Sequence, residues 1–139
     1  MKTQLHWQQL PPIPDREGFA APIAGVSNGA LIVAGGANFP DKKPWEGGRK
    51  RWYDTAFALE RPDGAWRGGL KLPRPNAYGV SLTTPDGIVS IGGADAERHL
   101  RDVFLLAWNG AGLTTKPLPS LPKPLAYSCG ALLGQTIYV

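Results

Sequence analysis

A short motif that occurs twice constrains the fold of this 139-residue chain more than any other feature. Residues 30–37 (ALIVAGGA) match residues 87–94 (GIVSIGGA), and the two glycine pairs lie 57 positions apart (92 − 35). Self-similarity at a fixed spacing is typical of repeat architectures, in which each repeat is one supersecondary unit that packs on its neighbours. The chain is therefore predicted to consist of similar units placed one after another.

Each unit has the pattern of four strands. A strand-like run, a turn and a second run lead to the glycine pair, and a loop, a third run, another turn and a short fourth run follow it. Glycine (18) and proline (14) are in excess and lie between short apolar runs, as expected for many strands joined by turns. The first and third runs are residues 19–26 and 52–59 in one unit and 77–82 and 102–108 in the other; Trp66 and Leu113 mark the fourth.

This pattern predicts an all-β fold, a kelch-type β-propeller fragment of about two and a half four-stranded blades. Glycine near the propeller axis would let crowded strand backbones approach one another. The alternative is an antiparallel sandwich in which the glycine pairs coincide by chance. We expect a lone closing strand with its connector, two blades, and the first half of a third blade, at residues 1–14, 18–72, 77–117 and 125–139.

Two complete blades cannot close a ring, because each blade buries its faces against its neighbours. The chain alone is therefore expected to expose apolar blade faces and strand edges, and to self-associate through these open edges.

Composition argues against several classes of protein. The longest apolar stretch, residues 30–34, is far shorter than the roughly 20 residues that span a bilayer, so we expect no membrane partner. The N-terminus lacks the apolar segment of a secretion signal, which favours a cytoplasmic protein, or a periplasmic one if the native start is missing. The single cysteine, Cys129, excludes an internal disulfide, and its apolar surroundings predict a buried thiol.

The net charge of +4 raises the question of an anionic partner. The cations cluster at residues 42–51, without any nucleic-acid-binding motif, so we expect no nucleic-acid partner. Two readings stay open: a solvated basic loop, or a site for a small anionic molecule. No histidine cluster has metal-ligand spacing, and we expect neither a metal nor a cofactor.

Strand connectivity predicts which loops share a face. In an up-and-down blade, the loop after the second strand and the connector to the next blade emerge on the same side. Residues 37–51 and 94–101 should therefore lie beside residues 73–76 and 122–125. These loops offer a mixed, net-positive mouth suited to a polar anionic small molecule. Its candidate binding residues are Asn38, Glu46, Arg49, Arg51, Arg74, Asn76 and Tyr78.

Residues 25–40 and 76–82, together with Trp52-Tyr53-Asp54, resemble the cyclically permuted mutarotase branch of the kelch-type N-acetylneuraminate epimerases. The resemblance runs over nearly the whole chain. It implies a six-bladed propeller that interconverts the anomers of sialic acid without a metal or organic cofactor, with a carboxylated sugar as its ligand. It also implies that the catalytic glutamate proposed for the family lies in a blade that would follow Val139, so the catalytic residues stay unknown.

The function so implied is that of a fragment of a carbohydrate mutarotase or epimerase, inactive alone, in a protein that exchanges sialic-acid anomers by acid/base chemistry. The alternative, from a different class, is a kelch-repeat module that binds another protein through its loops and has no catalytic role.

Overall fold

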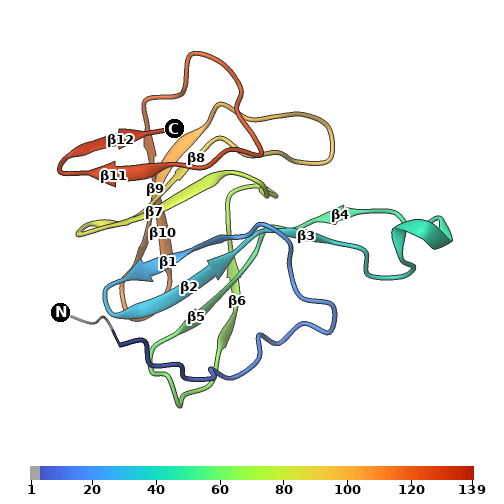
Figure 1. The fold of residues 1–139 in the computed structure, drawn as a ribbon, viewed down its shortest axis with the longest axis horizontal. Helices are drawn as coiled ribbons and strands as arrows, with labels where there is room; N and C mark the ends of the chain where they lie inside the picture. Colours follow the sequence, from blue (N-terminus) through green and yellow to red (C-terminus); the bar gives the residue numbers. More distant parts are fainter. Residues whose placement is uncertain (1–3) are drawn as a thin grey trace.

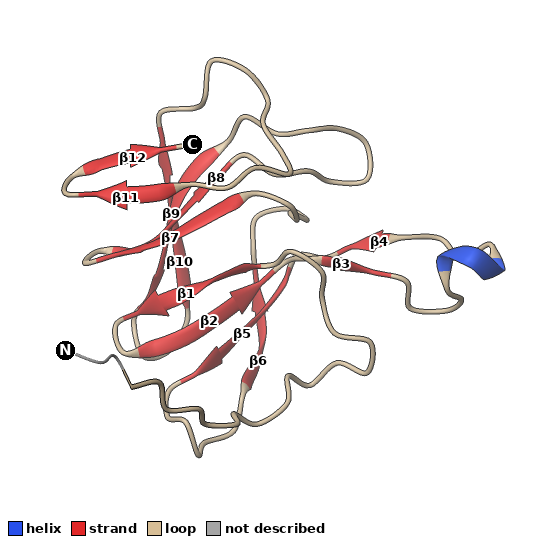
Figure 2. Cartoon of the chain, in the orientation of Figure 1, coloured by secondary structure: helices blue, strands red, loops and turns tan. Residues whose placement is uncertain are grey.

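The computed structural model describes residues 4–139, and their regular structure is almost entirely antiparallel β (Figures 1 and 2). One sheet has the order β1 (Ile23–Ser27), β2 (Ala30–Ala34), β5 (Thr55–Leu59), β6 (Arg67–Lys71). A second sheet has the same connectivity, with β7 (Val80–Thr84), β8 (Gly87–Ile91), β9 (Val103–Trp108) and β10 (Leu113–Leu118). Both sheets are four-stranded meanders, which confirms the prediction of an all-β fold built from repeated units.

Two small hairpins complete the architecture. The first joins β3 (Ala37–Asn38) to β4 (Arg51–Trp52) and carries a single 3₁₀ turn, η1 (Pro44–Glu46), at its tip. It projects away from the two sheets (Figure 1), and residues 37–52 are called the long hairpin below. The second pairs β11 (Ala131–Leu133) with β12 (Thr136–Tyr138) beside the second sheet.

Local sequence explains the tight turns inside the sheets. Asn28 and Gly29 both have positive φ, +47° and +77°, and connect Ser27 to its partner Ala30. Positive φ at both central residues is the requirement of a type I′ hairpin, and Asn-Gly is the pair that meets it most readily. Alternate burial along β2 then points Ala30, Ile32 and Ala34 into the core.

The glycine pairs lie where the two sheets approach each other. Gly35 has φ +68°, and a Cβ at this position would come 2.2 Å from the carbonyl oxygen of Asn76. The next glycine, Gly36, donates its N–H to that same oxygen at 2.8 Å. Gly93 makes the equivalent bond to Leu125 in the following unit, also at 2.8 Å. The close approach expected from the sequence is therefore an inter-unit hydrogen bond that repeats along the chain.

Apolar packing and side-chain hydrogen bonds join the first sheet to the second. Ile23 and Ile32 of the first sheet share one buried cluster with Ile88 and Leu106 of the second. Polar side chains of β7 also satisfy the free edge of β1: the N–H of Ala24 donates to Ser81 Oγ at 3.2 Å, and that of Val26 to Thr83 Oγ1 at 3.0 Å. Backbone N–H groups at the edge strand β1 of the first unit are thus hydrogen-bonded to side chains of the second unit.

The structure differs from the sequence-based expectation at three places. Residues 4–14 of the expected closing strand form no strand, because none of the described strands pairs with them; residues 1–3 lie outside the described part. The third run of the first unit divides into β4 and β5, since Trp52 pairs with Ala37 of the long hairpin. Cys129 is exposed, and the prediction of a buried thiol is wrong, because no other described unit covers that side of the last hairpin.

Candidate functional site

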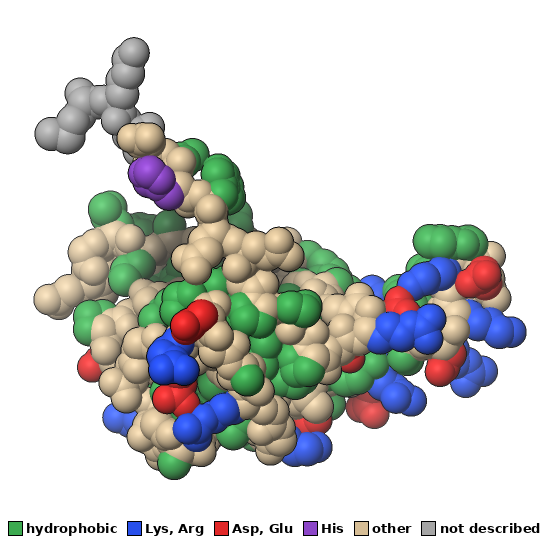
Figure 3. All heavy atoms as spheres, turned by 90° about the horizontal axis from the view of Figure 1, so that it is seen from below, with side chains coloured by type: hydrophobic (Ala, Val, Ile, Leu, Met, Phe, Trp, Pro, Cys, Tyr) green, Lys and Arg blue, Asp and Glu red, His purple; other side chains and the backbone are tan. Residues whose placement is uncertain are grey.

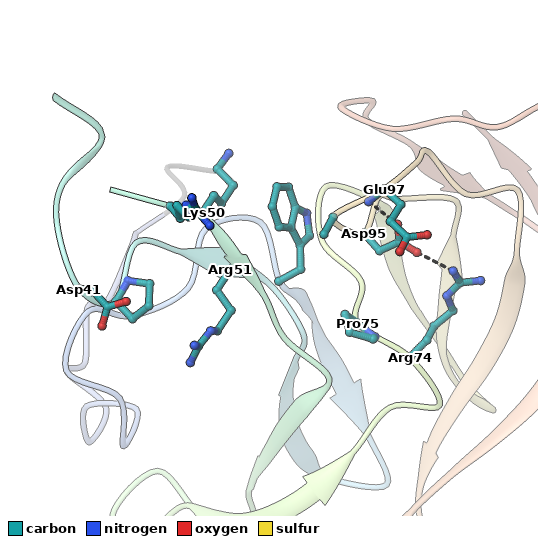
Figure 4. Close-up of a pocket in the computed structure, with 11 residues that line it drawn as sticks. Asp41, Lys50, Arg51, Arg74, Pro75, Asp95 and Glu97 are labelled. Carbon is teal, nitrogen blue, oxygen red and sulfur yellow. Dashed lines mark hydrogen bonds and ion pairs between the residues drawn. The ribbon is translucent and has the colours of Figure 1, made fainter. Parts of the chain in front are cut away.

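Loops from both sheets line an open cavity of about 560 Å³ at the base of the long hairpin. In Figure 4, Asp41, Lys50 and Arg51 lie on the hairpin side, whereas Pro75, Asp95 and Glu97 lie across from them. Three of the four loops that connectivity predicted to share a face therefore meet here. The cavity is lined by Pro40, Asp41, Arg49, Lys50, Arg51, Trp52, Arg74, Pro75, Asp95, Ala96 and Glu97.

The hairpin side of the cavity is an ordered structure. Asn38 pairs with Arg51 across β3 and β4, and at the tip the N–H of Lys43 donates to Glu46 Oε2 at 3.0 Å. The tip lies beyond the cavity, so the candidate Glu46 is not among the lining residues. Figure 3 shows Lys and Arg side chains gathered on this projection. The candidate Glu46 therefore stabilises the tip of the hairpin and takes no part in the cavity.

Arg49 and Arg51 are exposed cations that line the cavity. Neither has an ion-pair partner among residues 4–139, which leaves both guanidinium groups able to bind a carboxylate in the bidentate manner that suits them. The structure therefore brings these two candidates together at one site with their donors available.

Arg74 also lines the cavity, but its charge is already balanced. One guanidinium nitrogen contacts Asp95 Oδ2, and the other lies 3.2 Å from Asp102 Oδ2. Figure 4 shows the contact with Asp95 as a dashed line. Because Arg74 lies in the connector between the sheets and both carboxylates lie in the second unit, this network ties the two units together at the cavity.

The two candidate asparagines are buried and hold backbone in place. Asn38 Nδ2 donates to the carbonyl of Gly18 at 2.7 Å, while its Oδ1 accepts from the Tyr53 hydroxyl at 2.8 Å. Asn76 is only 1% exposed, and its Nδ2 donates to the carbonyl of Gly92 at 3.0 Å. Both side-chain amides hold the loops around the cavity in place, and neither asparagine is among the residues that line it.

Tyr78 lies at the junction of all three units. It has φ +64°, its N–H donates to Ala21 O at 3.0 Å, and its carbonyl accepts from Tyr127 N at 2.8 Å. The rings of Tyr78 and Tyr127 pack with centroids 4.5 Å apart. Its hydroxyl accepts a hydrogen bond from Lys50 Nζ at 2.9 Å, so this candidate is joined to the hairpin side of the cavity.

Lys50 and Asp95 are cavity residues that the candidate set leaves out. Asp95 Oδ1 accepts the N–H groups of Glu97 and Arg98, at 2.9 and 3.0 Å. Burial favours the neutral acid, but these two bonds together with Arg74 outweigh it and hold the pKa of Asp95 below its usual value. An aspartate in the short loop between two strand-like runs is typical of such an Asx turn, and that signal was available in the sequence.

Neither a metal-binding group of side chains nor a membrane-spanning helix occurs in the part of the chain that the structure describes. No group of three or more His, Cys, Asp or Glu side chains there is arranged to hold a metal ion. No helix there is long and apolar enough to cross a membrane.

Comparison with known proteins relates this geometry to a family. A family model described as N-acetylneuraminate epimerase matches residues 1–115. The N-acetylneuraminate epimerase of Brucella suis is 36% identical over 127 residues, which cover 80% of this chain and 32% of the relative. The N-acetylneuraminate epimerase of Yersinia enterocolitica is 35% identical over 129 residues, with the same coverage.

The solved structure titled "Structure of YjhT" aligns with a TM-score of 0.71 at 29% identity, over 83% of this chain and 35% of that one. The fold is thus that of a β-propeller fragment, and the chain spans about a third of the length of the curated relatives it matches. With its two repeated sheets and a family match over residues 1–115, the chain belongs to the N-acetylneuraminate epimerase family.

Proposed function

We propose that this chain supplies part of the ligand-binding mouth of a propeller that interconverts the anomers of a carboxylated, sialic-acid-like sugar. One observation carries the proposal: the cavity presents two exposed guanidinium groups, Arg49 and Arg51, with no carboxylate partner in the described part of the chain. Family membership supplies the class of sugar, because the relatives are named N-acetylneuraminate epimerases.

The chemistry asks for two proton transfers. The anomeric hydroxyl loses a proton as the ring oxygen gains one, the bond between the anomeric carbon and the ring oxygen breaks, and reclosure on the other face gives the second anomer. In this proposal the cavity binds the carboxylate, which is bonded to the anomeric carbon, and so holds the reacting centre at the mouth while the rest of the opened sugar rotates before reclosure. The acid and the base are not assigned to residues of this chain, and we propose that the chain alone is inactive.

The experiment is a titration of the 139-residue protein with N-acetylneuraminate, followed by NMR or calorimetry. Arg49→Ala and Arg51→Ala should each weaken binding by about tenfold or more, because a charge-assisted hydrogen bond contributes roughly 1.5–3 kcal/mol. Lys42→Ala is the matched control, since Lys42 is exposed on the same hairpin but does not line the cavity. Unchanged affinity in both arginine variants would remove the cavity as the binding site.

A protein-interaction module is the second candidate, and one observation favours it. Trp45 at the tip of the long hairpin is 82% exposed, and a large apolar side chain held out on an ordered projection is the kind of group that anchors protein contacts. The titration separates the two proposals, because an interaction module would bind no N-acetylneuraminate in the wild-type protein.

A further inference from the structure

Lys50 is the one cavity cation that is surrounded by aromatic rings. Its ammonium nitrogen lies 4.9 Å from the ring centroid of Tyr78, 5.5 Å from that of Trp52 and 5.6 Å from that of Phe39. It also donates to the Tyr78 hydroxyl at 2.9 Å. The residue is half-buried, whereas its neighbours Arg49 and Arg51 are exposed. The ammonium is therefore partly removed from water and held in one place.

The charge of Lys50 has no anionic partner among residues 4–139. The carboxylates on the far side of the cavity do not provide one, because Asp95 is paired with Arg74, and no ion pair joins Lys50 to Glu97. A partly desolvated ammonium is costly unless it is compensated, and the electron-rich faces of the three rings compensate it only in part. An ammonium has three N–H donors, of which the Tyr78 hydroxyl takes one.

The support behind Lys50 is rigid on both sides. Lys50 immediately precedes β4, whose Arg51 is paired with Asn38 in the hairpin, and Tyr78 is fixed by backbone bonds to Ala21 and Tyr127. Tyr78 keeps a positive φ, a backbone conformation that few non-glycine residues adopt and that persists where the surroundings hold it. The ammonium of Lys50 is consequently held beside Tyr78, at the cavity that Lys50 lines.

We propose that Lys50 is the specificity-determining residue of the cavity, the group that selects a carboxylated sugar over a neutral one. This inference rests on the proposed function. A carboxylate entering between the long hairpin and residues 94–101 would complete the ion pair that Lys50 lacks, with Arg49 and Arg51 guiding it from the exposed rim. A neutral sugar would leave the half-buried ammonium uncompensated, and so would gain nothing from Lys50.

The test compares two ligands on two proteins. N-acetylneuraminate carries the carboxylate, and its methyl ester has the same ring without the charge. Lys50→Met keeps an unbranched side chain against the aromatic rings and removes the ammonium. Wild-type protein should bind the acid about tenfold more tightly than the ester, and Lys50→Met should lose that preference by weakening acid binding alone. Lys42→Met, on the exposed part of the same hairpin, should retain the full preference.

A structural role for Lys50, as a tether between the hairpin and Tyr78, predicts a different result. It would make Lys50→Met weaken the acid and the ester by equal factors, and that result would overturn the inference while leaving the proposed function in place. Failure of the wild-type protein to bind either ligand would overturn the proposed function and this inference with it.

A measurement on the wild-type protein covers the case in which Lys50→Met does not fold. With ¹³Cε-labelled lysine, the Lys50 signal should shift on addition of the acid and stay unchanged with the ester, and Lys50→Arg identifies that signal by its loss. A Lys50 signal that is insensitive to a bound acid would contradict the assignment.

Discussion

The backbone N–H of Tyr127 donates to the carbonyl of Tyr78 at 2.8 Å, one unit after the N–H of Tyr78 donates to the carbonyl of Ala21 at 3.0 Å. All three residues have positive φ, from +47° to +64°, and they hold the same place before the inner strand of their units. The repeat seen in the sequence is thus also a repeat of backbone conformation. It builds a ladder of hydrogen bonds that crosses from unit to unit.

A side-chain contact between the two sheets leads to the first prediction. Ser27 is 4% exposed, and its Oγ accepts the N–H of Trp108 at 3.0 Å from the neighbouring sheet. Ser27→Ala should lower the free energy of unfolding by about 1–3 kcal/mol, because it leaves a buried N–H without an acceptor. Urea denaturation measures the change. Ser120→Ala, at an exposed position, should stay within about 0.5 kcal/mol of wild type, and equal effects of both variants would contradict the prediction.

The glycine pair leads to a prediction that separates backbone conformation from crowding. Gly35 and Gly47 both have positive φ, +68° and +78°, so alanine pays a similar conformational cost at either site. Only at Gly35 would the new Cβ meet backbone, 2.2 Å from the Asn76 carbonyl oxygen; at Gly47 nothing lies within 4 Å. Gly35→Ala should therefore destabilise by about 1–3 kcal/mol more than Gly47→Ala in urea denaturation. A difference near zero would mean that the two units separate easily at this contact.

Much of the fold could be predicted because its signals are local. The turn at Asn28-Gly29 needs only two residues with positive φ. The glycine pairs mark the places where the backbones of neighbouring units come close together. The meeting of the long hairpin with residues 73–76 and 94–101 follows from strand connectivity, which the number and order of strands determine. None of these features depends on which side chains touch.

The roles of individual side chains could not be predicted, because contacts between distant residues decide them. Arg74 looks like a free cation in the sequence until Asp95 and Asp102 are placed beside it. Lys50 is one of several hairpin cations until the ring of Tyr78, 28 positions away, is brought against it. Burial of Cys129 depends in the same way on neighbours that no pattern within its own segment can supply.

The exposed apolar side chains of the last hairpin predict self-association of the 139-residue polypeptide. Leu133 is 71% exposed and Tyr138 58%, on strands that lack an outer partner in the described structure, and Val139, which follows β12, is 53% exposed. Light scattering at rising concentration should detect species larger than the 14.9 kDa monomer. Leu133→Asp should reduce them, and Ala111→Asp, in an exposed turn, should not. A wild-type monomer that melts cooperatively at all concentrations would contradict this prediction.

The Arg74–Asp95 contact predicts a loss of stability in acid. The pKa of Asp95 is lowered in the folded protein because two backbone N–H donors and Arg74 outweigh the opposing effect of burial, so folding favours the carboxylate. A carboxyl group whose folded pKa is depressed contributes stability that is fully present above its unfolded pKa, near 3.9, and is lost as pH falls through the folded value. The melting temperature of wild-type protein should therefore fall below about pH 4. In Asp95→Asn the melting temperature should be lower at neutral pH and should change less over that acidic range.

Asp86→Asn, in an exposed turn, is the control and should follow the wild-type curve of melting temperature against pH. Parallel curves for wild type and Asp95→Asn would show that Asp95 contributes nothing to the acid dependence.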